Sequence, residues 1–219
     1  MKTCLLFDLD GTLLDTLGDL CGSVNFALAQ AGLPGCSMEQ VRAYVGNGAR
    51  NLIFRAVQGD EARVPEVLAT FQTHYRQHCR DLTRPYPGIL EQLALLADVP
   101  VAIVSNKPDA AVGELARLYF PGLLAMGERA GIPRKPAPDM LRLAMAELGA
   151  EQCIYIGDSE VDVTTAKNAG VPCLSVSWGF RDEETLRRAG ADHICREPQE
   201  LCAVLRQMHK ELEQEKDMP

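Results

Sequence analysis

Short apolar runs alternate with longer segments of helical periodicity over most of the chain. Four runs are wholly or mainly apolar, as is typical of strands that a parallel sheet buries on both faces; they are Cys4–Phe7, Val101–Val104, Cys153–Ile156 and Cys173–Val176. Helical patterns lie between or after these runs, at Ile89–Ala97, Met140–Leu148, Val161–Ala169 and a segment after Asp182. Strands that alternate with helices predict βαβ units, with a parallel sheet and helices on both of its faces.

The interval from about Thr16 to Arg84 breaks this alternation, because it contains helical patterns only. Ser37-Met38-Glu39-Gln40 is a capping-box pattern that opens one of its helices, and Val64–Cys79 continues the helical spacing. Pro85-Tyr86-Pro87-Gly88 then marks the return to the strand and helix alternation. We therefore predict an α/β protein whose Rossmann-like parallel sheet core comprises residues 1–15 and 85–219, with an inserted helical domain at residues 16–84.

Composition and charge narrow the class of protein. Of the 219 residues, 47% are hydrophobic and 24% charged, a balance typical of folded globular domains. The net charge of −8 opposes general nucleic-acid binding. No apolar stretch approaches the 18 or more residues of a membrane span. The N-terminal apolar run is interrupted by Asp8 and is too short and too acidic for a signal peptide. The 8 cysteines form no CxxC pair, so we expect reduced thiols in a cytoplasmic protein. A monomer and a homodimer both stay open.

Two carboxylates follow the first predicted strand. Asp8 and Asp10 stand two residues apart, and Gly11 and Thr12 come next. Ligands of open α/β sheets bind beyond the carboxyl ends of the strands, so this position suits a functional site. Neighbouring carboxylates repel unless a cation lies with them or one is protonated, which indicates either a metal site or a nucleophile beside an acid/base. A polar turn after a strand is the alternative interpretation.

A second pair of carboxylates follows another predicted strand. Asp158 comes directly after the strand and Gly157, and Asp162 lies four residues on, near the first turn of the next helix. By themselves the two could cap that helix. Together with Asp8 and Asp10 at the same edge of the sheet they favour a Mg²⁺ site, since this ion binds one or two protein carboxylates beside a substrate phosphate.

Two further segments suit a phosphate group. Ser105 and Asn106 end an apolar strand, where a hydroxyl, an amide and backbone N–H groups can reach a phosphate oxygen, although both residues are also common helix caps. Lys135 precedes a helix between Arg134 and Pro136, and the prolines around it stiffen its approach. A fixed ammonium can neutralise charge on a phosphoryl group, whereas an isolated lysine there is usually solvated.

These four segments, in this order, resemble the four motifs of the haloacid dehalogenase superfamily, and the resemblance covers essentially the whole chain. It implies that Asp8 attacks phosphorus and forms an aspartyl-phosphate, and that Asp10 acts as general acid and base. It also implies Mg²⁺ ligation by Asp8, Asp158 and the backbone carbonyl of Asp10, with Asp162 acting directly or through water. Ser105 and Lys135 would hold the phosphoryl group, with Thr12 and Asn106 beside it. The insertion of residues 16–84 is similar to a helical cap.

Within the superfamily the chain resembles the phosphoglycolate phosphatases. Three segments carry this similarity, Tyr44-Val45-Gly46-Asn47-Gly48, Ser105-Asn106-Lys107 and Trp178-Gly179-Phe180-Arg181. The resemblance implies a small phosphorylated metabolite as substrate, with 2-phosphoglycolate expected. Gly46 and Asn47 would bring a cap loop to it, and Lys107, Arg50 and Arg181 are the cationic candidates for its carboxylate.

Other functions on the same scaffold stay open at this point. A sugar-phosphate mutase would use the same aspartyl-phosphate behind a cap that excludes water, and a pyrophosphatase or nucleotidase would share the metal site. A non-enzymatic binding protein is disfavoured, because such a protein has no need for a nucleophile beside an acid/base. Dehalogenation is disfavoured too, since the dehalogenases of the superfamily lack the second aspartate found here at Asp10.

Overall fold

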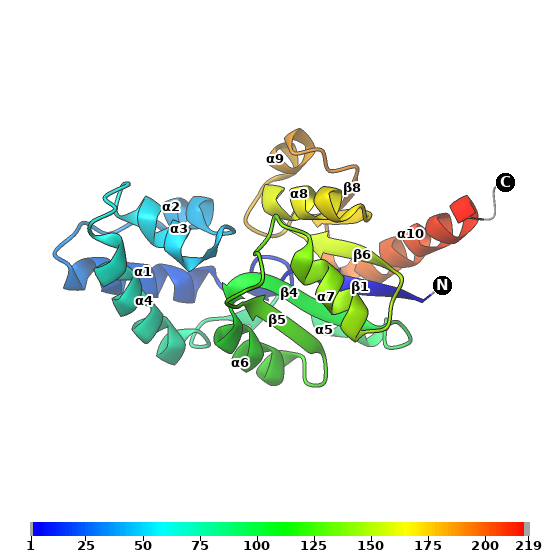
Figure 1. Cartoon of the computed structure of the whole chain (residues 1–219), viewed down its shortest axis with the longest axis horizontal. Coiled ribbons are helices and arrows are strands. Elements are labelled where there is room, and N and C mark those ends of the chain that lie inside the picture. Colours follow the sequence, from blue (N-terminus) through cyan, green and yellow to red (C-terminus); the bar gives the residue numbers. More distant parts are fainter. Residues whose placement is uncertain (1, 217–219) are drawn as a thin grey trace.

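A six-stranded parallel sheet forms the centre of the molecule in the computed structural model, which describes residues 2–216 (Figure 1). Its strands are β1 (Thr3–Phe7), β4 (Val101–Pro108), β5 (Leu124–Glu128), β6 (Gln152–Gly157), β7 (Cys173–Val176) and β8 (His193–Cys195). Their order is β5-β4-β1-β6-β7-β8. The strand order therefore reverses at β1, which pairs with β4 on one side and with β6 on the other.

Helices cover both faces of this sheet. Alternate residues of a strand point to opposite faces, so Leu5 and Phe7 of β1 pack in one cluster while Cys4 and Leu6 pack in another. The first face is covered by α5 (Ile89–Ala94), α6 (Asp109–Tyr119) and α10 (Leu201–Lys216), and the second by α7 (Asp139–Glu147) and α8 (Glu160–Ala169). The helix α9 (Glu183–Arg188) packs beside α8, and a short 3₁₀ helix, Pro198–Glu200, leads into α10. The predicted α/β fold with a parallel sheet is confirmed.

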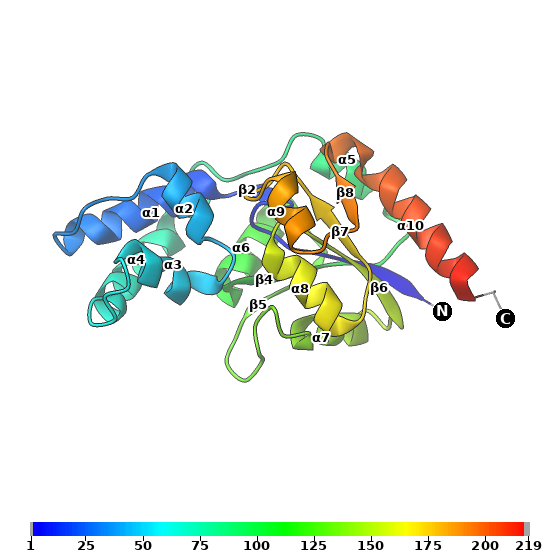
Figure 2. The same ribbon diagram turned by 90° about the horizontal axis from the view of Figure 1, so that it is seen from above.

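Four helices form a lobe beside the carboxyl end of the sheet (Figures 1 and 2). They are α1 (Leu17–Gln30), α2 (Met38–Tyr44), α3 (Gly48–Ala56) and α4 (Val64–His78). The chain enters the lobe through β2 (Leu14–Asp15) and leaves it through β3 (Arg84–Pro85), and these two strands pair antiparallel. Both crossings of the chain therefore lie side by side, at the two ends of the predicted helical insertion.

The structure confirms one predicted helix start and contains two strands of the parallel sheet that were not predicted. The capping box predicted at Ser37 is present, with Gln40 N bonded to Ser37 Oγ and the Gln40 side chain bonded back to Ser37 N. The strands β5 and β8 were not predicted, since both are edge strands with partly exposed residues and no continuous apolar run. Residues 1 and 217–219 of the predicted core lie outside the described residues. Within the described part of the chain, no helix is both long and apolar enough to cross a membrane.

Candidate active site

The reversal of strand order places three neighbouring strand ends at one edge of the sheet. Asp8 follows β1, Ser105 lies in the last part of β4, and Asp158 follows β6. The backbone N–H of Asp8 still bonds to the carbonyl of Ile156 at 2.8 Å, which continues the pairing of β1 with β6 up to the site. Residues that are 50 to 150 positions apart in sequence therefore converge at the point where ligands of open α/β sheets bind.

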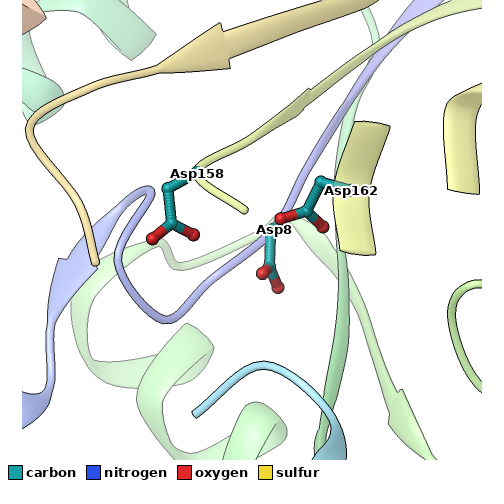
Figure 3. A group of neighbouring side chains, drawn as sticks. All are labelled: Asp8, Asp158 and Asp162. Atoms are coloured by element: carbon teal, nitrogen blue, oxygen red, sulfur yellow. The ribbon is translucent and has the colours of Figure 1, made fainter. Parts of the chain in front are cut away.

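Three carboxylates form a cluster at this edge (Figure 3). Asp8, Asp158 and Asp162 are all buried, and each offers an oxygen within 4.8 Å of the others. Asp8 comes from β1, Asp158 from the end of β6 and Asp162 from the first turn of α8. Burial of three like charges so close together is costly unless cations compensate them.

Lys135 supplies one compensating charge. Its ammonium lies 3.0 Å from Asp8 Oδ1 and 2.8 Å from Asp162 Oδ1, and it donates a further hydrogen bond to the Tyr155 hydroxyl. The second oxygen of Asp162 accepts hydrogen bonds from the backbone N–H and the hydroxyl of Ser159. Both oxygens of Asp162 are thus engaged, so this residue holds Lys135 and the start of α8 in place, while Asp8 keeps an oxygen free of Lys135.

Asp158 is held from the opposite side by two loops. Its Oδ1 accepts from the Thr12 hydroxyl at 3.3 Å, and its Oδ2 accepts from the backbone N–H of Phe180 at 2.7 Å. Gly11, at a φ of +82°, and Gly179 pass so close to Asp158 that a Cβ on either would collide with its carboxylate side chain. Thr12 therefore contacts Asp158, rather than the cavity, and glycine is required at both loops for the carboxylate to fit.

The pKa values of these groups follow from their surroundings. Burial, aided by the charges of Asp162 and Asp10 and opposed by Lys135, raises the pKa of Asp8 to about 6. Burial and the charges of Asp162 and Asp8 raise the pKa of Asp158 well above its ordinary value. Burial also acts against ionisation of Asp162, but Lys135 and the hydrogen bonds to this carboxylate outweigh it and leave its pKa lowered. Asp8 and Asp158 thus form an all-oxygen donor set whose repulsion a divalent cation would relieve, a chemistry that fits Mg²⁺.

Asp10 has a different partner. The ammonium of Lys107 lies 2.9 Å from both Asp10 oxygens, and the face of the Tyr75 ring covers the ammonium with 4.6 Å between Nζ and the ring centroid. The Lys107 side chain is 3% exposed and that of Asp10 13% exposed. Lys107 therefore fixes the orientation of the Asp10 carboxylate, a contact that sequence analysis did not predict.

A cavity of about 50 Å³ lies between the cluster and the helical lobe. Core residues at its base include Asp8, Asp10, Ser105, Lys107 and Asp158. The lobe contributes apolar side chains, together with the first residues of α3; these lining residues are Leu20, Val45, Gly46, Gly48, Ala49, Leu52, Phe71 and Tyr75. Gly46 lines the cavity, whereas Asn47, which precedes α3, is not among the lining residues.

Polar contacts join the lobe to the core around this cavity. The Asn106 amide donates to the carbonyls of Gly46 and Lys135, and its oxygen accepts from the Lys135 backbone N–H. Arg181 donates to the carbonyls of Arg42 and Val45, at the end of α2, and also pairs with Glu160 in the core. Asn106 and Arg181 are consequently engaged in positioning the lobe.

Arg50, the third cationic candidate of the sequence analysis, lies away from the cavity. Its side chain is 53% exposed, and its guanidinium forms an ion pair with Glu61 within the lobe. Of the three candidates, Lys107 alone lines the cavity.

Sequence analysis missed three residues of this region. Tyr155 lies inside a buried strand and Tyr75 inside a helix, where each pattern indicates a core residue. Ser159 had a signal, since Ser159 and Asp162 stand at capping-box spacing and the structure forms that box.

Comparison with known proteins agrees with this architecture. The family model of the haloacid dehalogenase-like hydrolases matches residues 5–176. Phosphoglycolate phosphatase of Pseudomonas putida is 36% identical over 190 residues, which cover 80% of this chain and 70% of that protein. Phosphoglycolate phosphatase of Agrobacterium fabrum is 36% identical over 190 residues, which cover 81% of each chain. A crystal structure from Lactobacillus delbrueckii subsp. bulgaricus, described as a candidate phosphoglycolate phosphatase, superposes with a TM-score of 0.89 at 35% identity and covers 93% of this chain and 98% of that one.

The chain therefore belongs to the haloacid dehalogenase-like hydrolases. The family and the hydrolase class predicted from the sequence are both confirmed.

Proposed function

We propose that the protein is a Mg²⁺-dependent phosphatase that cleaves a small phosphomonoester, 2-phosphoglycolate, through an aspartyl-phosphate on Asp8. The proposal rests on one observation: two carboxylates lie at the end of one strand in different surroundings. Asp8 lies between Lys135 and the acidic cluster, while Asp10 is held separately by Lys107. Carboxylates in contrasting environments are typical of sites where one serves as nucleophile and the other as acid/base.

Asp8 and Asp158 would hold the Mg²⁺, together with the backbone carbonyl of Asp10. Bound there, Mg²⁺ supplies positive charge beside the transferring phosphoryl group. Asp162 has both oxygens engaged by Lys135, Tyr155 and Ser159, which supports a role in orienting its neighbours or in contacting the ion through water.

The chain's own residues carry the two chemical steps. In the first, a carboxylate oxygen of Asp8 forms a bond to phosphorus while the ester P–O bond breaks, and Asp10 gives its proton to the leaving oxygen. In the second, Asp10 takes a proton from water as the water oxygen attacks phosphorus, which releases inorganic phosphate and restores Asp8. The ammonium of Lys135 and the hydroxyl of Ser105 neutralise and orient the phosphoryl oxygens.

A cationic side chain in the cavity lining supports the choice of substrate. Among the described residues that line the cavity, Lys107 is the cationic side chain, so in addition to holding Asp10 it would attract a substrate carboxylate. The curated relatives named phosphoglycolate phosphatase support the same substrate.

A panel of phosphate esters assayed with Mg²⁺ tests the proposal. We expect 2-phosphoglycolate to give the highest kcat/KM, above glycerol phosphates, hexose phosphates, nucleoside monophosphates and pyrophosphate. A preference for a hexose phosphate or a nucleotide would overturn the substrate assignment and keep the phosphatase assignment. Failure to release phosphate from any ester, including a generic aryl phosphate, would overturn both.

A further inference from the structure

A buried hydroxyl that has no hydrogen-bond acceptor within the protein lies beside the cavity. Tyr75, on α4, is 4% exposed, and its hydroxyl oxygen is fully covered. Among the described residues, three buried side-chain groups lack a hydrogen-bond partner, those of Thr16, Tyr75 and Ser175. Tyr75 is the one of these three that lines the cavity.

An unsatisfied hydroxyl at this position has a cost. Burying such a group without a partner destabilises a fold by about 1–3 kcal/mol, and native proteins contain few of them. A phenylalanine would fill the same space and avoid that cost. The hydroxyl therefore needs a hydrogen-bond acceptor from the cavity, which a bound ligand can supply.

The charge surrounding Tyr75 defines what that partner must be. Burial raises the pKa of the Tyr75 phenol far above its ordinary value, so the hydroxyl keeps its proton and needs an acceptor. The nearest charged side chain, Lys107, is an ammonium, which has donors only and cannot serve. The carboxylate of Asp10 accepts from Lys107, and no hydrogen bond joins it to the Tyr75 hydroxyl. The required acceptor is thus an anionic or carbonyl oxygen in the cavity.

Two residues that carry donors line the cavity together. Lys107 comes from the core and Tyr75 from the lobe, and they are in contact through the cation–π interaction. The neighbouring lining residues Leu20, Leu52 and Phe71 are apolar, so a charged group beside the two donors would be shielded from water. A carboxylate fits this arrangement, because it offers one oxygen to each donor.

We propose that Tyr75 and Lys107 form a subsite for the substrate's carboxylate, and that the Tyr75 hydroxyl sets the preference for carboxylate-bearing phosphate esters. The inference rests on the proposed phosphatase activity. It adds a specificity-determining residue on the lobe, opposite the phosphate-binding groups of the core. It also explains how a two-carbon substrate with little apolar surface can be distinguished from other small phosphates.

A pair of matched substrates and a pair of matched variants test this subsite. Phosphoglycolate and ethyl phosphate differ in whether a carboxylate or a methyl group ends the two-carbon chain, so the ratio of their kcat/KM values isolates recognition of the carboxylate. Tyr75→Phe removes the hydroxyl and keeps the ring over Lys107. We expect it to lower that ratio by about 10- to 150-fold, the effect of one hydrogen bond to a charged group. Because the hydroxyl is unpaired, the variant should unfold at a temperature no lower than the wild type.

Tyr119→Phe is the control variant. It removes a hydroxyl that donates to the Thr83 carbonyl at 2.6 Å, outside the cavity, and should leave the ratio at the wild-type value. An unchanged ratio in Tyr75→Phe, or equal losses on both esters, would overturn the subsite. A wild-type enzyme without any preference for phosphoglycolate would overturn it together with the substrate assignment.

A readout independent of turnover separates this inference from the proposed function. The increase in unfolding temperature that each ester produces can be measured without Mg²⁺ for the wild type and for Tyr75→Phe. A larger increase with phosphoglycolate that Tyr75→Phe abolishes supports the subsite, even if the protein hydrolyses neither ester. Equal increases with both esters in the wild type count against it.

Discussion

Replacing Asp8 by asparagine should stabilise the metal-free protein while it abolishes the proposed chemistry. Asp8 is buried, and the penalty of burying its charge exceeds the stabilisation from Lys135, so its pKa is raised from 3.8 to about 6. A shift of about 2.2 units corresponds to about 3 kcal/mol of destabilisation when the carboxylate is ionised. Asparagine has nearly the same shape and carries no charge, so the variant gains up to this amount. For a protein of this size, that is roughly 6–12 °C in Tm.

The stability that Asp8→Asn gains over the wild type should increase with pH. The folded-state pKa of Asp8 lies above its unfolded value, so the penalty is absent below about pH 3.8 and is complete above about pH 6. The advantage of Asp8→Asn should therefore be largest near pH 7.5 and fall to about half of that value at pH 5. Thermal unfolding by circular dichroism, with EDTA present at both pH values, measures it.

Asp162→Asn is the matched contrast. Asp162 also contacts Lys135, but its pKa is lowered, because Lys135 and its hydrogen bonds outweigh the effect of burial. A lowered pKa contributes stability above the unfolded pKa that is lost as the pH falls, so this variant should be less stable than the wild type at pH 7.5, with a deficit that shrinks in acid. Breaking such a buried pair costs about 3–5 kcal/mol. The electrostatic reasoning fails if Asp8→Asn is the less stable of the two variants, or if both differences from wild type are independent of pH.

Three further predictions concern activity and the lobe. EDTA should abolish phosphatase activity and Mg²⁺ restore it, while Ca²⁺ supports it poorly because of its larger, looser coordination; activity in a metal-free preparation would contradict the site. Lys107→Ala should lower kcat/KM for both phosphoglycolate and an aryl phosphate, since Lys107 orients Asp10, with a further loss of about 10- to 150-fold on phosphoglycolate alone. Arg181→Ala leaves the carbonyls of Arg42 and Val45 without this donor. We therefore expect a loss of about 1–3 kcal/mol in unfolding free energy and a raised KM. An unchanged KM would show that the lobe is positioned by other contacts.

The central strands of the sheet, and the polar residues that follow them, could be predicted from the sequence alone. A buried strand needs a continuous apolar run, so β1, β6 and β7 were recognisable within a residue at each end, while β4 runs four residues beyond its predicted end and through Ser105. A parallel sheet then requires that residues after such strands meet at one edge, which is why Asp8, Ser105 and Asp158 could be assigned to one site. These features depend on short-range patterns and on a general rule of the fold.

Only the tertiary structure decided which charged groups are partners. The spacing of residues along the chain gives no indication that Lys107 pairs with Asp10 or that Tyr75 covers Lys107. Nor does it indicate that Asp162 accepts hydrogen bonds from Lys135 and Tyr155. Tyr75 had the pattern of a core residue, because helical periodicity reports burial but does not report whether a hydroxyl finds a partner. Its place in the cavity depends on how the helical lobe packs over the sheet edge, and that packing is fixed by contacts between residues far apart in the chain.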